Sequence, residues 1–177
     1  PAIDETLFNA MKALSVLPKI QKGLAIAKQQ AHQAMAEQVE LCEIASPTFH
    51  EENRAKEIAN RMKKYGLSDV SIDGIGNVIG VRKGTGNGPV LVIEAHMDTV
   101  FPHGIDVTVR QEGNTYYAPG IGDNTSGCRA LLQLVRCFNE ANIQTEGDIL
   151  FEKKAMVTFE VPNTLLMANV KLTVAWV

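Results

Sequence analysis

The stretch of sequence that decides the fold is VLVIEAHMDT, residues 90–99. Its first four residues form a continuously apolar run, which predicts a central strand over residues 90–93 that is buried on both faces. Directly after this run come Glu94, His96 and Asp98, three side chains that can carry a charge. Because α/β sheets bind their ligands beyond the carboxyl ends of the strands, we expect a functional site at this point of the chain.

Outward from this strand, helical and strand-like segments follow one another along the chain. Apolar residues at helical spacing predict one long helix over residues 24–44, which ends before Pro47. Thr48 precedes Glu51 by three residues, and this capping-box pattern predicts a second helix that runs to about Tyr65. The same kind of pattern predicts a third helix over residues 125–139, and strands over residues 70–72, 77–81, 106–111, 115–118 and 148–151. We therefore expect an α/β fold in which helices pack on a mixed, largely buried β-sheet.

The composition is that of an ordinary globular protein. With 45% hydrophobic and 21% charged residues, the chain is neither disordered nor collagen-like. Its 17 Lys and Arg residues are scattered and outnumbered by 20 Asp and Glu residues, which argues against a nucleic-acid partner. No apolar run approaches the ~20 residues that cross a bilayer, so we expect a soluble protein without a membrane partner.

The cysteines bear on the cellular compartment. The chain has three, Cys42, Cys128 and Cys137, and an odd number without a CxxC pair favours free thiols in a reducing compartment. No signal-peptide pattern is visible. We therefore expect a cytoplasmic protein, with a removed export signal as the alternative because the chain begins at Pro1 rather than Met.

The first candidate site pairs His96 with Asp98. In an extended chain, residues two apart point the same way, so these two side chains share one face. An imidazole that binds a metal needs its second ring nitrogen anchored, usually by a carboxylate, and Asp98 is placed to do this. The alternative is an ordinary surface contact between His96 and Asp98 in a loop.

The second candidate is Asp123, in the stretch APGIGDNTSG at residues 118–127. Gly120 and Gly122 free the backbone from steric restriction, and Asp123 falls where the third helix is expected to begin. The carboxylate can cap that helix, or it can offer its oxygens to a cation. A carboxylate can also bridge two metal ions ~3.5–4 Å apart, as two-metal hydrolases require.

Four segments taken together resemble a known family. They read ASP at residues 45–47, GNV at 76–78, AHMDTVFP at 95–102 and APGIGDN at 118–124. In this order and spacing they are similar to the zinc-dependent peptidases and amidohydrolases, which include tripeptide aminopeptidase (peptidase T), aminoacylase, glutamate carboxypeptidase, carnosinase and acetylornithine deacetylase. The resemblance runs from about residue 36 to residue 151.

The resemblance implies a zinc-exopeptidase-like fold and a role for each candidate residue. His96 is then a ligand of one of two zinc ions, Asp98 orients its imidazole, and Asp123 bridges both ions. The peptide bond between Asp123 and Asn124 is expected to be cis. The implied substrates are small peptides or N-acyl amino acids, and the oligomeric state is left open.

The sequence departs from the family after Phe151. In the family, the strand that starts at Gly147 leads to two adjacent glutamates, a general base and a zinc ligand, but here residues 152–160 read EKKAMVTFE. The later acidic ligand, the last histidine ligand and the inserted dimerisation domain are also missing. We therefore expect residues 1–151 to be the N-terminal part of a zinc peptidase catalytic domain. Residues 152–177 are expected to be an atypical tail, truncated or frame-altered, with a hairpin around Pro162 and Asn163.

Two functions remain in competition. The leading hypothesis is a metal-dependent hydrolase of peptide or N-acyl amide bonds, of aminopeptidase-like type, whose site is incomplete. The alternative is a non-catalytic α/β fragment with at most weak metal binding. With only His96 and Asp123 as recognisable ligands, zinc should bind weakly. Tight binding would require replacement ligands, of which Glu94, Glu152 and Glu160 are the first candidates.

Overall fold

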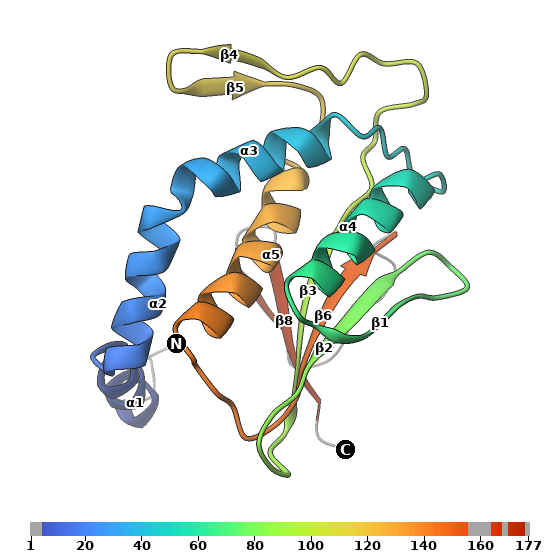
Figure 1. The fold of residues 1–177 in the computed structure, drawn as a ribbon. Helices are drawn as coiled ribbons and strands as arrows, with labels where there is room; N and C mark the ends of the chain where they lie inside the picture. The colour runs from blue at the N-terminus through green and yellow to red at the C-terminus, as the bar shows by residue number, and fades with distance from the viewer. Residues whose placement is uncertain (1–4, 156–163, 168–169, 176–177) are drawn as a thin grey trace.

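The chain folds into helices packed on a β-sheet (Figure 1). The computed structural model describes residues 5–155 and the strands at residues 164–167 and 170–175. Over these residues the helices are α1 (Glu5–Ser15), α2 (Pro18–Gln29), α3 (Ala31–Cys42), α4 (Glu52–Lys64) and α5 (Thr125–Glu140). The strands are β1 (Ser68–Ile72), β2 (Val78–Arg82), β3 (Val90–His96), β4 (Arg110–Glu112), β5 (Thr115–Tyr117), β6 (Ile149–Lys154), β7 (Thr164–Met167) and β8 (Val170–Ala175).

The larger sheet is mixed, and its described strands follow the order β1-β2-β6-β3-β8-β7. At its centre β3 and β6 run parallel, whereas the other neighbouring strands pair antiparallel. Helix α5 lies between β3 and β6 in sequence, and a long crossover of this kind is what parallel neighbours require. The predicted α/β fold with a mixed sheet is therefore confirmed.

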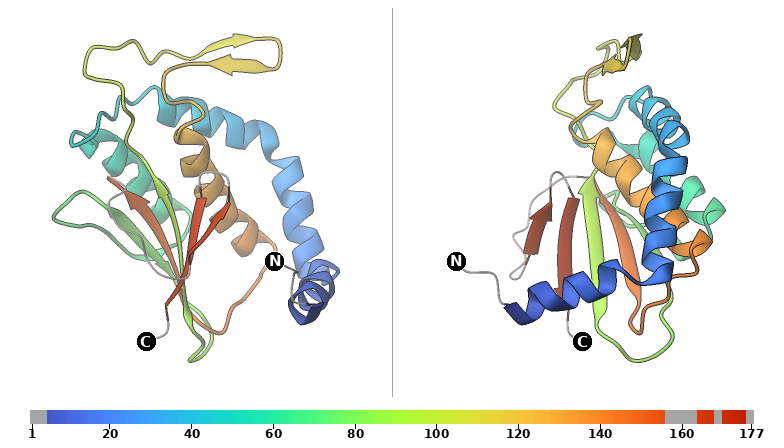
Figure 2. Two further views of the ribbon diagram at one scale, coloured as in Figure 1. Left: turned by 180° about the vertical axis from the view of Figure 1, so that it is seen from behind. Right: turned by 90° about the vertical axis from the view of Figure 1, so that its left-hand side faces the viewer.

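Helices α4 and α5 cover one face of this sheet (Figure 2). Because side chains alternate along a strand, one set faces these helices, and it includes Ile93 of β3 and Phe151 of β6. Both are buried with Ile58 of α4 and Leu132 of α5, and each such side chain contributes ~1.5–3 kcal/mol to stability. Residues 90–92 are only half-buried, so the expectation that this strand is buried on both faces is wrong for its first part.

The single helix expected over residues 24–44 is in fact two helices, α2 and α3. The chain bends at Gln30, whose side-chain amide donates to both carboxylate oxygens of Glu140 at 2.9 Å. The bend allows α2 and α3 each to contact α5. Neither proline nor glycine marks this position, so the local sequence pattern does not predict the break. The hydrogen-bond partner of Gln30 at the break lies 110 residues away in sequence.

Helix α4 ends about where it was predicted to end, but its start differs from the prediction. It begins at Glu52, and the expected capping box is absent. The Thr48 hydroxyl instead donates to Asp98, and the Glu51 carboxylate accepts from the backbone N–H of Phe49 at 2.8 Å. Both polar groups of the apparent capping box therefore serve the loop before the helix.

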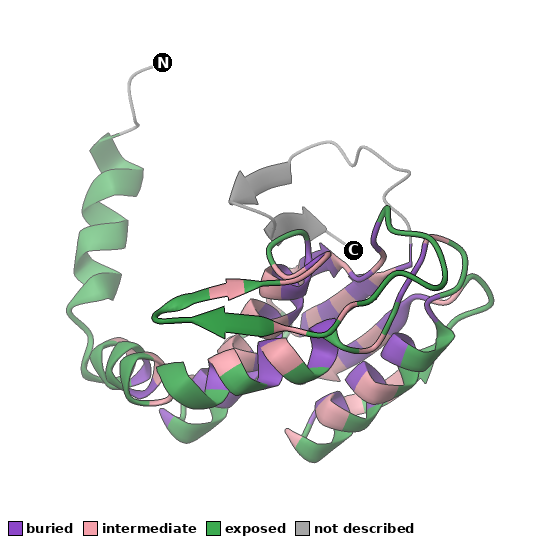
Figure 3. Cartoon of the chain, turned by 90° about the horizontal axis from the view of Figure 1, so that it is seen from above, coloured by how far each residue is buried: buried purple, intermediate pink, exposed green. Residues whose placement is uncertain are grey.

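Two segments stand away from the sheet: Figure 3 shows this for α1, and Figure 1 shows it for the hairpin of β4 and β5. Helix α1 has no buried residue, and the hairpin of β4 and β5 projects from the end of the molecule near α3. Of the strand expected at residues 106–111, only residues 110 and 111 lie in β4, which extends to Glu112. No helix in the described part of the chain is long and apolar enough to cross a membrane.

The end of the chain contributes to the same sheet. Strand β6 extends to Lys154, β8 pairs with β3, and β7 pairs with β8 as an antiparallel hairpin. The hairpin was expected around Pro162 and Asn163, which lie outside the described residues. That part of the expectation stays untested.

Candidate metal centre

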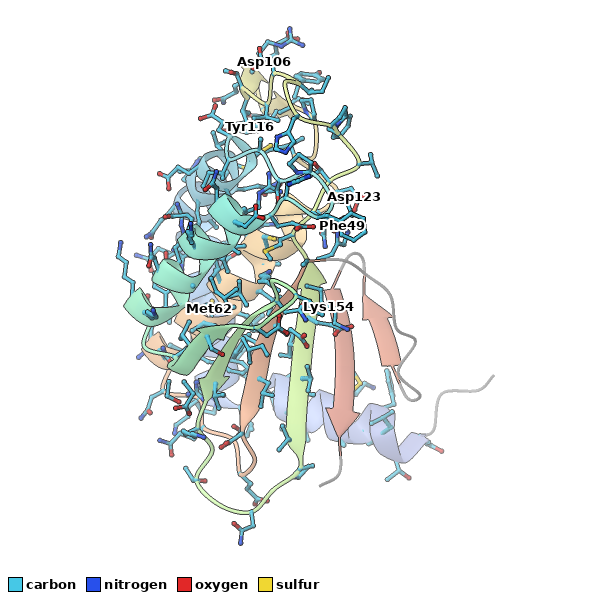
Figure 4. All side chains as sticks on the ribbon, turned by 90° about the vertical axis from the view of Figure 1, so that its right-hand side faces the viewer. Phe49, Met62, Asp106, Tyr116, Asp123 and Lys154 are labelled. Carbon is cyan, nitrogen blue, oxygen red and sulfur yellow. The ribbon has the colours of Figure 1, made fainter. Side chains whose placement is uncertain are left out.

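The candidate centre lies where the parallel strands end. His96 is the last residue of β3, Asp98 follows two residues later, and Asp123 lies just before α5. Figure 4 shows Asp123 beyond the carboxyl end of β3, close to Phe49 in that view. The topology thus brings the predicted residues to the edge of the sheet at which α/β folds bind ligands.

The imidazole of His96 lies between two carboxylates. Its Nδ1 is 3.0 Å from Oδ1 of Asp98, and its Nε2 is 3.0 Å from Oδ1 of Asp123. The hydrogen bond to Asp98 raises the pKa of His96 above its ordinary value, more than burial lowers it. The expected approach of two residues 27 positions apart is therefore found, and the ring has the anchored second nitrogen that a metal ligand needs.

Asp98 is in turn held on its other oxygen. The Thr48 hydroxyl donates to Oδ2 at 2.8 Å. The two chain segments are also joined through the backbone, because the N–H of Thr99 donates to the carbonyl of Ser46 at 2.8 Å. Burial alone would raise the pKa of Asp98, but the hydrogen bonds from His96 and Thr48 outweigh it and lower the pKa. Both oxygens of the Asp98 carboxylate are thus hydrogen-bonded, and the carboxylate is favoured in its charged form.

Asp123 does not cap α5, which was the alternative role considered for it. The cap of α5 is Asn124, whose side-chain oxygen accepts from the N–H of Gly127 at 3.0 Å. The Asp123 side chain is 79% exposed, which leaves its carboxylate accessible to a cation. Gly120 has φ +80°, and a Cβ there would meet Cγ2 of Thr99 at 2.7 Å, so only glycine fits this approach.

The peptide bond between Asp123 and Asn124 is cis, as the resemblance implied.

The replacement ligands considered from the sequence do not join this centre. Glu94 is buried and pairs with Nζ of Lys154 at 2.8 Å. Glu152 lies opposite Glu94 across the two strands, two register positions before the pair of His96 and Lys154, and Glu160 lies outside the described residues. Among residues 5–155, no group of three or more His, Cys, Asp and Glu side chains is arranged to hold a metal ion. The imidazole and carboxylate fit zinc chemistry, but the donor set is short of three protein ligands.

Two lysines occupy the end of β6 beside His96. Lys154 is the register partner of His96, and Lys153 points to the opposite face, where it is fully buried. The Lys153 ammonium donates to the carbonyl of Gly127 at 3.0 Å, and burial lowers its pKa to about 8. In the family, this strand leads to two adjacent glutamates. Here it ends in two lysines instead.

Two residues near the centre escaped the sequence reasoning. Thr48 was assigned to helix capping, and its true partner is 50 residues away. Arg54 was not singled out, although it precedes Ile58 and Met62 at intervals of four and shares their buried stripe on α4. A charged residue on the apolar stripe of a helix is the signal that would have found it.

Comparison with known proteins finds similarity to peptidases and hydrolases. Residues 77–153 match Peptidase family M28. A Pyrococcus abyssi (strain GE5 / Orsay) protein described as a LysW-lysine/LysW-ornithine hydrolase is 41% identical over 93 residues, which cover 52% of this chain and 26% of that protein. The chain thus spans about a quarter of the length of this relative.

Solved structures give the same result. A tripeptidase from Staphylococcus aureus subsp. aureus Mu50 superposes with a TM-score of 0.58 and 26% identity, over 69% of this chain and 35% of that chain. A dinuclear metal-binding peptidase from the M20 family of Bacillus subtilis shares the fold with a TM-score of 0.54, at 17% identity over 71% of this chain and 35% of that chain. The comparisons therefore confirm the resemblance predicted from the sequence, that of this chain to the metal-dependent peptidases and amidohydrolases.

Proposed function

We propose that the chain is the N-terminal part of the catalytic domain of a zinc-dependent hydrolase of peptide or N-acyl amide bonds, of aminopeptidase-like type. The observation that carries the proposal is the placement of His96 between Asp98 and Asp123, each at 3.0 Å, at the carboxyl end of β3. In this proposal residues 1–151 form the catalytic part and residues 152–177 an atypical tail.

Each residue of the centre has one role. Asp98 accepts the proton of His96 Nδ1, so that Nε2, which lies 3.0 Å from Asp123, would be the nitrogen that binds a metal ion. Asp123 offers a carboxylate that can bridge two ions. When bound, zinc acts as a Lewis acid that polarises a carbonyl and lowers the pKa of water. Thr48 holds the Asp98 carboxylate in place through its hydrogen bond.

A cavity of about 600 Å³ lies beside Phe49, the residue after Thr48, and is also lined by Ile72 and Ile75. Its lining includes charged side chains but not His96, Asp98 or Asp123. Ligand pockets commonly enclose ~300–1,000 Å³. The proposed substrates are the small peptides and N-acyl amino acids that the family resemblance implies, and a cavity of this size is large enough for them.

Because the donor set is incomplete, we expect this chain to bind zinc weakly and to hydrolyse substrates poorly. Zinc needs three or four protein ligands, and the described residues supply His96 and Asp123. Loss of a general base alone costs about 10²–10⁴ in rate. The second candidate function, a non-catalytic α/β fragment with weak metal binding, rests on the same shortage of ligands and on the lysines at the end of β6.

The proposed location is the cytoplasm. All three cysteines are buried free thiols, which is what a reducing compartment favours.

The proposal is tested by comparing the chain with two histidine variants. His96→Ala removes the central imidazole, and His32→Ala removes an exposed imidazole on α3 as a matched control. We expect weak zinc binding in calorimetric titration that His96→Ala abolishes and His32→Ala preserves, with little or no hydrolysis of tripeptides and N-acyl amino acids. Zinc binding that survives His96→Ala would refute the site, and fast zinc-dependent turnover would refute its incompleteness.

A further inference from the structure

Arg54 is a buried charge close to the candidate metal centre. It lies in the first turn of α4, and its side chain is completely excluded from solvent. Between residues 5 and 155 no carboxylate lies within ion-pair distance of it, although the charge of Asp98 is near enough to favour its charged form. Burial without a paired carboxylate is costly for a cation, and it lowers the pKa of Arg54 below its ordinary value. An apolar residue at this position would avoid that cost.

The Arg54 guanidinium binds three backbone carbonyls instead. Nη1 donates to the carbonyl of Met97 at 2.8 Å. Nη2 donates to the carbonyls of Ile44 at 2.6 Å and Cys42 at 3.3 Å, and Nε donates to Ile44 at 3.0 Å. The last carbonyls of a helix have no partner within it, so Arg54 satisfies part of the end of α3. The same planar group reaches the end of β3, which a single ammonium cannot do with equal geometry.

The carbonyl of Met97 matters for the site because of its position in the chain. Met97 stands between His96 and Asp98, and its own side chain is buried in the core. Fixing the carbonyl of Met97 fixes the peptide plane that leads into Asp98. The backbone of this turn is thus held by Arg54 from inside the molecule, and the Asp98 carboxylate is held by Thr48 from the loop before α4.

We propose that Arg54 is a positioning residue of the candidate metal centre, which locks the peptide at Met97 to the end of α3 so that Asp98 and His96 keep their mutual geometry. The proposal rests on the proposed function for its purpose, since the geometry matters because His96 is a metal ligand. It assigns no contact between Arg54 and substrate or metal.

The test compares Arg54 with a second arginine of the same helix. Arg61 lies seven residues further along α4, its side chain is 12% exposed, and it is paired with the carboxylates of Glu37, Glu40 and Glu57. Substitution of either arginine by Met or Lys removes a largely buried hydrogen-bond network. Only the network of Arg54 includes the backbone between His96 and Asp98.

Two readouts separate positioning from stability. In ¹⁵N-histidine-labelled chain without metal, nuclear magnetic resonance reports whether the Nδ1 proton of His96 is protected by its hydrogen bond. Zinc titration reports the affinity, which typically falls 10–100-fold when an outer partner of a metal ligand is lost. We expect Arg54→Met and Arg54→Lys to lose the protected proton and to bind zinc 10–100-fold more weakly, while Arg61→Met and Arg61→Lys keep both properties.

Other results overturn the proposal. If the Arg54 variants fold and keep the protected proton and the zinc affinity, Arg54 positions nothing. If both Arg54 variants unfold and both Arg61 variants fold, Arg54 is an architectural residue and the positioning role is rejected. If the unaltered chain binds no zinc, the proposed function fails, and the His96 proton signal alone still decides the role of Arg54.

Discussion

The two parallel strands at the centre of the sheet end side by side, yet their ends carry opposite chemistry. β3 ends at His96, which lies between two carboxylates. β6 ends at Lys153 and Lys154, one buried in the core and the other paired with Glu94. Within the bodies of the two strands Ile93 lies opposite Phe151, and both side chains are buried in the same core. The fold therefore requires apolar strand bodies, whereas the last residues of each strand are free to set the chemistry of the edge.

The largest effect is expected where the two strands are alike. Phe151→Ala empties a fully buried position in the core, and we expect the free energy of unfolding to fall by ~3–5 kcal/mol. Leu150→Ala, on the other face of the same strand and only half-buried, should cost clearly less. Chemical denaturation of both variants checks the prediction, which equal losses would contradict.

The buried charge of Lys153, at the end of β6, should destabilise the folded chain. The pKa of Lys153 is about 8 in the folded chain against an ordinary value of 10.5, so below pH 8 the folded state bears the whole cost of the buried charge. Between pH 8 and 10.5 the unfolded state binds the additional proton, and stability rises with pH. We expect the stability of Lys153→Met relative to the unaltered chain to fall by about 3 kcal/mol between pH 7 and pH 10.5, as the unaltered chain gains stability.

Denaturation of the chain and of Lys153→Met from pH 7 to 10.5 measures this difference. A difference that is constant over this range would show that the lysine is not a buried cation in the fold.

The neighbouring lysine should behave in the opposite way. Lys154→Met leaves the buried carboxylate of Glu94 without the cation at 2.8 Å. We expect a loss of about 2 kcal/mol at pH 7, because a buried charged group that loses its partner keeps its desolvation cost. Replacing both residues, as Lys154→Met with Glu94→Gln, should restore part of the loss. Denaturation that finds Lys154→Met as stable as the unaltered chain would contradict the pairing.

The smallest of these effects is expected at the end of β3. Thr48→Val removes the hydroxyl that donates to Asp98 at 2.8 Å and preserves the shape of the side chain. We expect a loss of about 1.5 kcal/mol in the free energy of unfolding, as for a hydrogen bond to a charged group. Thr115→Val in the exposed hairpin strand β5 serves as the control. Equal effects of the two substitutions would argue that Thr48 does not support the centre.

The sequence predicted the elements of the centre better than their supports. The approach of His96 to Asp123 could be predicted because the family resemblance makes both residues ligands of a shared zinc ion. The strand, the glycine-rich turn and the helix start that carry them have local patterns. Thr48 could not, because its local capping pattern competes with a partner 50 residues away. The bend at Gln30 was missed for the same reason, since Glu140 binds it across the fold. Local pattern predicts elements, and long-range hydrogen bonds decide how polar residues between them are used.

The most direct test of the central claim, that His96 and a carboxylate together bind the metal, is X-ray absorption spectroscopy of the zinc-loaded chain. We predict nitrogen and oxygen ligands at ~2.0–2.2 Å, with an imidazole contribution that disappears in His96→Ala. Sulfur ligands at ~2.3 Å, or an imidazole contribution that His96→Ala leaves unchanged, would contradict the account.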